Sequence, residues 1–187
     1  LAGGGSVAIS RDGRAVAYTG RTASGRALIL RRLGELRSTP LPHTDDELPP
    51  FFSADGQWLA FGQRGRLMKL PIAGGEPTVV ADVAQPGSWS SRGMMVLSSE
   101  IGGLRTVSPA GMVSPLTQPE TTGGPHLHRM PVVLADGETV LFTDNPAAAN
   151  LNAARIGIAS LSTGKFTTLD FPAVYPLGVI DGNLVYV

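Results

Sequence analysis

Short apolar segments alternate with polar turns along the whole chain, and the turns share one sequence pattern. Phe51–Gly62 shows it best, with apolar residues, a Ser-Ala-Asp-Gly turn and a second apolar segment. This pattern predicts two antiparallel strands joined by a hairpin, in which Asp and Gly supply the positive φ angles of a tight turn. The turn recurs with glycines at positions 13, 56, 93, 137 and 182, at steps of 37 to 45 residues.

A repeat of this length holds four short strands, which is typical of one blade of a β-propeller. The sequence therefore predicts an all-β protein, a β-propeller of four-stranded antiparallel blades. We expect one propeller domain over residues 1–187, with blades at approximately 6–44, 45–83, 84–118 and 119–172 and the start of a fifth at 173–187. The turn residues predicted to be structural are Asp12, Gly13, Asp55, Gly56, Asp136, Gly137, Asp181 and Gly182.

The predicted ring is open, because the fifth blade stops at Val187 inside its second strand. A propeller protects the edges of its sheets by closing radially. Three arrangements would cover the open blade. The first, which we favour, is that further blades follow in a longer parent protein. The others are a homodimer through the open blade edges and a tight four-blade ring with a frayed tail.

Composition and charge narrow the classes of function. Of the 187 residues, 42% are hydrophobic, which suffices for a substantial core, and 15 basic residues balance 15 acidic ones. A net charge of zero gives no bulk attraction to nucleic acid, so we expect no nucleic-acid partner. The absence of cysteine excludes disulfides and thiolate chemistry but leaves the cellular compartment open.

The ends of the sequence and its apolar runs bear on membrane association. No apolar run approaches the ~20 residues that a membrane-spanning helix needs, so we expect no direct membrane insertion. The N-terminus lacks the regions of a signal peptide, and Leu1 is not an initiator methionine. We expect a piece of a longer protein, or a processed form.

The repeat resembles the TolB-type, WD-like β-propeller repeat of bacteria. The best copy is the second blade, with Phe52–Gly56, Trp58–Phe61 and Leu70–Gly75. Leu41–Thr44, Gly87–Ser90 and His128–Pro131 are more particularly similar to propellers appended to bacterial eukaryote-like serine/threonine kinases. Departures such as Arg92 in place of the third turn Asp leave the fold prediction intact.

The resemblance implies a sensing or interaction module, placed outside the cytoplasmic membrane after a kinase and a membrane span. No nucleotide loop, His-Arg-Asp or Asp-Phe-Gly motif is present in the 187 residues. We therefore expect this chain itself not to be an enzyme, and its partner to be a protein, a peptide or a cell-wall ligand. Two alternatives stay open: a gating propeller of a prolyl-oligopeptidase-like peptidase, and a free-standing scaffold that associates with itself.

Catalytic and metal-binding patterns are weak. No Ser has Gly two residues before and two after it, which excludes the nucleophile elbow of hydrolases. His126 and His128 would point to the same side of an extended segment and could begin a metal site with Asp144 or Asp136. Zinc sites need three or four protein ligands, so packing or hydrogen bonding is the favoured interpretation. We predict no metal and no cofactor.

Two long segments of the fourth blade, Thr117–Met130 and Asp144–Ala154, are the best candidates for a binding site. In a four-stranded antiparallel blade, the connection into the first strand and the connection between the second and third strands emerge at the same rim. Long loops on a rigid scaffold often carry binding residues. The candidate binding residues at this rim are His126, His128, Arg129, Asp144, Asn145, Asn150 and Asn152.

Overall fold

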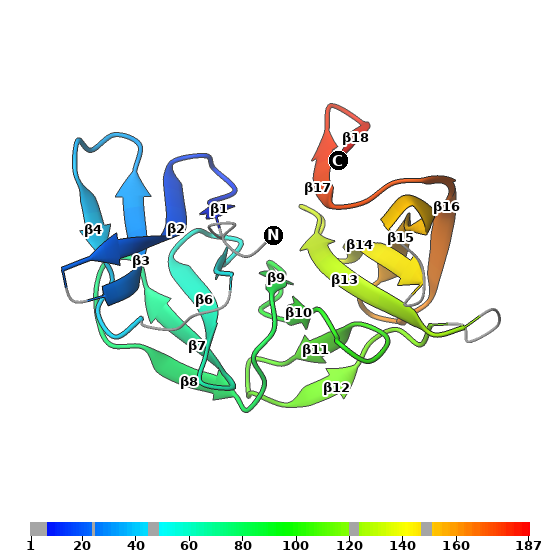
Figure 1. The fold of residues 1–187 in the computed structure, drawn as a ribbon, viewed down its shortest axis with the longest axis horizontal. Helices are drawn as coiled ribbons and strands as arrows, with labels where there is room; N and C mark the ends of the chain where they lie inside the picture. The colour runs from blue at the N-terminus through cyan, green and yellow to red at the C-terminus, as the bar shows by residue number, and fades with distance from the viewer. Residues whose placement is uncertain (1–6, 24, 45–48, 120–123, 147–150) are drawn as a thin grey trace. The chain divides into compact units, whose positions relative to one another are not determined.

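The strands form four four-stranded antiparallel sheets and one two-stranded sheet (Figure 1). The structure is a computed structural model, and it describes residues 7–23, 25–44, 49–119, 124–146 and 151–187. In each four-stranded sheet, strands that follow one another in the chain lie side by side, as in a propeller blade. The fold is therefore all-β, a partial propeller of about four blades, as the repeat predicts.

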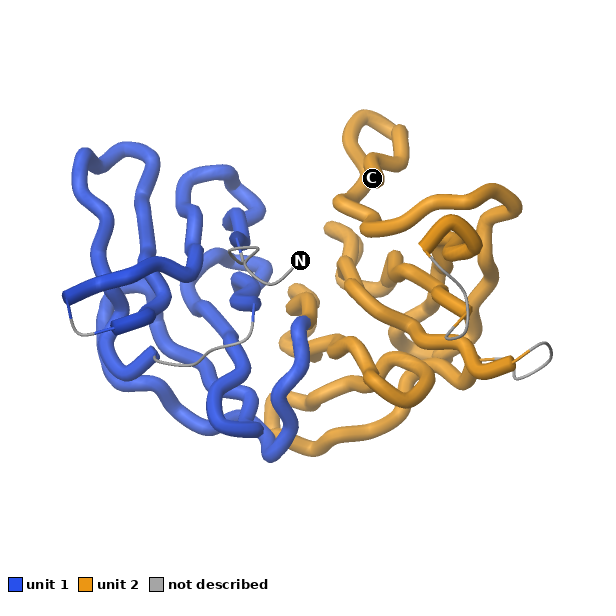
Figure 2. Tube along the Cα trace, viewed as in Figure 1, with its two compact units in different colours: residues 1–86 blue, residues 87–187 orange. Residues whose placement is uncertain are grey.

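The chain divides into two compact units, residues 1–86 and 87–187 (Figure 2). The first unit holds the first two blades. Its strands are β1 (Val7–Ile9), β2 (Ala15–Thr22), β3 (Gly25–Arg32), β4 (Ser38–Pro40), β5 (Phe51–Phe52), β6 (Trp58–Gln63), β7 (Arg66–Pro71) and β8 (Thr78–Ala81). That the blades form one propeller domain over 1–187 stays a prediction.

The second unit holds the third and fourth blades and a final hairpin. Its strands are β9 (Gly87–Trp89), β10 (Met95–Leu97), β11 (Arg105–Val107), β12 (Val113–Pro115), β13 (His126–Val133), β14 (Thr139–Pro146), β15 (Arg155–Ser160), β16 (Phe166–Pro172), β17 (Pro176–Ile180) and β18 (Asn183–Tyr186). A 3₁₀ turn, η1 (Leu151–Ala153), precedes β15. Among the described residues, no helix is long and apolar enough to cross a membrane.

Apolar side chains from adjacent sheets form the core of the first unit. Leu28 and Leu30 alternate on β3 and are buried, whereas all four residues from Leu59 to Gly62 on β6 are buried. Continuous burial means that both faces of β6 are covered. The core also includes Phe52 and Leu70.

In the second unit, Val96, Val140 and Phe142 belong to one buried cluster. Phe142 on β14 lies opposite Gly157 on β15, and a Cβ atom on Gly157 would collide with the Phe142 ring. The glycine is therefore required by packing, because the ring occupies the place of its side chain.

The repeated turns are held by serine and aspartate side chains. Ser10 Oγ donates to Asp12 Oδ1 at 2.6 Å, and the same oxygen accepts from Arg14 N at 3.0 Å. These two donors, the serine hydroxyl first, lower the pKa of the Asp12 carboxyl. Asp55 repeats the arrangement with Ser53 and Gln57.

The expected backbone geometry of these turns is partly wrong. Gly13, Gly56 and Gly137 have φ of 69°, 69° and 70°, but only the fifth turn also has a positive φ at its aspartate, 50° at Asp181. In the first turn, Gly13 N donates to Ser10 O and Ser10 N donates to Ala15 O. This longer loop needs one left-handed residue, so glycine alone takes that conformation.

Candidate functional site

The two polar segments of the fourth blade pair with each other. Residues 126–129 of β13 lie opposite residues 143–146 of β14, with His128 directly across from Asp144. The expectation that His126, His128 and Arg129 lie in a loop is wrong, because β13 begins at His126. Asp144 and Asn145 likewise belong to β14, which ends at Pro146. Backbone pairing between the segments lengthens the hairpin at its rim.

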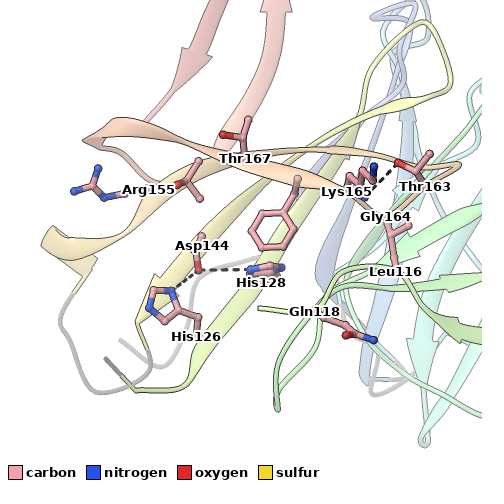
Figure 3. A pocket seen from close by; sticks show the side chains of 12 residues that line it. Leu116, Gln118, His126, His128, Asp144, Arg155, Thr163, Gly164, Lys165 and Thr167 are labelled. Carbon is pink, nitrogen blue, oxygen red and sulfur yellow. Dashed lines mark hydrogen bonds and ion pairs between the residues drawn. The ribbon is translucent and has the colours of Figure 1, made fainter. Parts of the chain in front are cut away.

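Strand geometry directs both histidines toward one carboxylate. Residues two apart on a strand share a face, and diagonal neighbours across a pair of strands are within reach of long side chains. His126 Nδ1 lies 2.8 Å from Asp144 Oδ1, and His128 Nε2 lies 3.6 Å from the same oxygen. Figure 3 shows the Asp144 side chain between the two rings. The contact of His126 with Asp144 is therefore a hydrogen bond, whereas the distance from His128 is too long for one.

His128 is fully buried among aromatic side chains. Its ring centroid lies 4.4 Å from that of Phe142 and 4.8 Å from that of Phe166, the latter in an edge-on arrangement. Its Nδ1 atom lies 2.7 Å from Thr117 Oγ1, while Nε2 has no hydrogen-bond partner among the described residues. Burial lowers the pKa of His128 to about 4, against the opposing influence of Asp144. The ring is therefore neutral near pH 7.

A cavity of about 880 Å³ lies beside this cluster. Its wall is mainly polar and comes from β13, β14, β15, β16 and the segments before β13 and β16. The lining residues are Leu116, Gln118, His126, His128, Asp144, Arg155, Thr163, Gly164, Lys165, Phe166, Thr167 and Thr168 (Figure 3). The candidate site is thus a concave surface within the second unit.

Among the described residues, three of the predicted rim residues do not line the cavity. Arg129 is exposed on β13, and Asn152 is exposed on the η1 turn. The side-chain oxygen of Asn145 is buried and accepts no hydrogen bond from the described residues. Asn150 lies outside the described residues. A binding role for these four stays a prediction.

Sequence reasoning missed the residues that come from other parts of the unit, such as Thr117, Lys165 and Thr167. Thr117 was the first residue of a candidate segment, but nothing marked its hydroxyl as the partner of His128. Lys165 lies in the turn between β15 and β16, a segment outside the two long segments that the sequence singled out.

The described residues contain no group of three or more His, Cys, Asp or Glu side chains that could hold a metal ion. His126, His128 and Asp144 are close together, but the shared Asp144 oxygen lies between the two rings. His126 is hydrogen-bonded to Asp144, whereas His128 is not.

Sequence comparison assigns no family to the chain. No protein-family model matches it, and no curated protein matches it significantly.

Solved structures show similar folds. TolB from Acinetobacter baumannii superposes with a TM-score of 0.71 at 18% identity, covering 91% of this chain and 44% of TolB. A chain of a nidogen/laminin complex superposes with a TM-score of 0.70 at 17% identity, covering 97% of this chain and 70% of that one. An oligogalacturonate lyase in complex with manganese superposes with a TM-score of 0.62 at 14% identity, covering 86% of this chain and 51% of the lyase chain.

These likenesses define the class as β-propeller, and the fold is TolB-like. The chain spans less than half the length of the Acinetobacter TolB. At these identities the fold alone is shared. Because propellers serve both as binding proteins and as enzymes, the site has to carry the functional argument.

Proposed function

We propose that this chain is a non-catalytic recognition module that binds its ligand in the cavity beside β13, β14 and β16. The observation that carries the proposal is the polar cavity of about 880 Å³ whose lining includes His126, Asp144 and the buried His128. Concave sites with a few convergent polar groups are where small ligands and peptide segments bind. The ligand class is a protein, a peptide or a cell-wall fragment.

A finer proposal concerns the parent protein. The similarity of Leu41–Thr44, Gly87–Ser90 and His128–Pro131 to propellers appended to kinases supports a parent protein that is a receptor-type bacterial serine/threonine kinase. This module would then be periplasmic or otherwise extracytoplasmic. The parent reading frame tests the proposal. It should encode a kinase domain and a membrane span upstream. A downstream Gly-x-Ser-x-Gly motif would instead identify the gating propeller of a peptidase.

A free-standing, self-associating scaffold is the second candidate function. It is favoured by β18, which pairs only with β17 among the described strands, and by the exposure of Val179 and Ile180 on that hairpin. A free strand edge with apolar side chains can pair with another chain. This candidate predicts a concentration-dependent dimer, whereas a recognition module needs no self-association.

Titration of the ¹⁵N-labelled chain with soluble peptidoglycan fragments and with mixed peptides tests the proposed function. We expect the imidazole signals of His126 and His128 to shift with the ligand while those of His43 do not. His43 is the matched control, because it makes an exposed pair with Glu76 in the first unit and does not line the cavity. Binding that moves neither cavity histidine would refute the assignment of the site.

A further inference from the structure

A hydrogen-bond chain fixes where the protons lie on the two cavity histidines. Thr117 Oγ1 accepts from Leu104 N at 2.8 Å and also lies 2.7 Å from His128 Nδ1. The threonine hydroxyl has no other acceptor among the described residues, and a proton on His128 Nε2 would face the Asp144 carboxylate. Both observations favour donation by the hydroxyl to His128 Nδ1. His128 then carries its proton on Nε2, which faces Asp144 Oδ1.

The same reasoning applies to His126. Its Nδ1 atom bonds a carboxylate oxygen, so that nitrogen carries the proton and donates. In the neutral imidazole, Nε2 of His126 carries a lone pair, and this atom has no hydrogen bond to the described residues. Asp144 Oδ2 likewise accepts no hydrogen bond from them. One end of the cavity therefore offers two adjacent acceptors, which suit a ligand that presents hydroxyl groups.

Lys165 supplies a positively charged hydrogen-bond donor to the same cavity. It is exposed on the turn before β16 and lines the cavity, and its ammonium group has no ion pair with the described residues. Arg155, the other lining cation, already binds Asp170 at 2.7 Å. Lys165 is thus the group available to an anionic part of a ligand.

The Lys165 turn is held in place by a carboxylate. Glu138 Oε1 accepts from Ser162 Oγ at 2.6 Å, from Ser162 N at 2.9 Å and from Ser160 Oγ at 2.8 Å. Gly164 takes a φ of 69°, and a Cβ there would strike the backbone oxygen of Leu116. An anchored turn positions the lysine with less entropy to lose on binding.

We propose that the cavity binds an acidic saccharide, with hydroxyl groups donating to Asp144 Oδ2 and His126 Nε2 and a carboxylate accepting from Lys165. The inference deepens the proposed function by naming the ligand class of the same site, and it rests on that function. A second observation supports a built site. His128 Nε2 is fully buried, lies 3.6 Å from Asp144 Oδ1 and has no hydrogen-bond partner among the described residues, so the site contains a buried polar group that these residues leave unpaired.

The test compares three probes by NMR titration of the whole chain: glucuronate, glucose and acetate. Glucuronate supplies hydroxyl groups and a carboxylate, glucose only hydroxyl groups, and acetate only a carboxylate. We expect glucuronate to bind about tenfold more tightly than either, because a charge-assisted hydrogen bond adds roughly that factor. Equal binding of glucose and glucuronate would overturn the proposal, as would binding of acetate as tight as that of glucuronate.

Matched variants locate the carboxylate partner. Lys165→Met should remove the preference for glucuronate over glucose, and Lys69→Met should keep it, since Lys69 is the other lysine of the chain and lies over Trp58 in the first unit. Lys165 is exposed, so this substitution leaves the core intact. An unchanged preference in Lys165→Met would contradict the proposal, and loss of binding in EDTA would show that a metal ion, rather than Lys165, holds the carboxylate.

The ¹⁵N shifts of the imidazoles give a readout that needs no ligand. We expect a protonated Nδ1 on His126 and a protonated Nε2 on His128; the opposite tautomer on His126 would remove the acceptor and overturn the proposal. If peptidoglycan fragments move the cavity histidines while glucuronate has no advantage over glucose, the ligand class is wrong and the proposed function stands. If no probe or fragment moves them, both fall.

Discussion

Acid should destabilise the second unit through the buried ring of His128. The pKa of His128 is about 4 in the folded protein, because burial disfavours the charged ring, and 6.5 is the ordinary value. The unfolded chain therefore binds a proton at a higher pH than the folded chain does. Stability contributed by the neutral ring is complete above pH 6.5 and is lost as the pH falls from 6.5 toward 4.

The size of the effect follows from the difference between the two pKa values. At 1.36 kcal/mol per pKa unit, the second unit should lose up to about 3 kcal/mol over this range. Asp144 opposes the shift and His126 adds to it, and both contributions are included in the folded value. The pKa values of turn carboxylates such as Asp12 and Asp55 are lowered. The stability that these carboxylates contribute is therefore lost at a lower pH.

Urea unfolding at several pH values between 4 and 7 measures this loss. Trp89 lies in the second unit and Trp58 in the first, so a Trp58→Phe background makes fluorescence report the second unit. His128→Phe should abolish most of the pH dependence in this window, whereas His43→Gln should leave it unchanged. An equal slope in the wild-type chain and in His128→Phe would refute the assignment.

Three further predictions follow from packing, the repeated turn and the free strand edge. Gly157→Ala should destabilise the second unit by about 1–3 kcal/mol, because the new methyl group collides with Phe142. Gly34→Ala is the control, because a Cβ atom at Gly34 would lie in open space. Equal urea midpoints for the two variants would contradict the expectation. Ser53→Ala should lower stability by about 1 kcal/mol through loss of its bond to Asp55, and an unchanged thermal midpoint would count against that. Light scattering should show mass rising with concentration if β18 pairs between copies, and a constant monomer mass would exclude that pairing.

The local part of the fold could be predicted from the sequence. The hairpin predicted for Phe51–Gly62 is formed by β5 and β6, because a hairpin is encoded by neighbouring residues. The segment before Met130 was taken as a loop because His126–Arg129 is polar and follows Gly and Pro. Its pairing with β14 satisfies the backbone, and that pairing is visible only when both segments are placed together.

The candidate site was predicted in part for the same reason. The spacing of His126 and His128 correctly placed both rings on one side, and topology brought Asp144 to them. The contact of Thr117 with His128 and the position of Lys165 at the cavity depend on neighbouring blades and strands. No local pattern encodes contacts between residues so distant in the chain, so these two residues could not have been singled out.

The β-bulge in β13 has a consequence for how this rim can change. Arg129 pairs with Thr143 and Val132 with Leu141, so Met130 and Pro131 together face a single residue of β14. Met130 takes a φ of 51° at this point, and its backbone N–H donates to Ser98 Oγ. The bulge separates the pairing of His126–Arg129 with β14 from the pairing of Val132 and Val133 with the same strand. New specificities can therefore evolve at the rim while the buried half of the same strand keeps its partners.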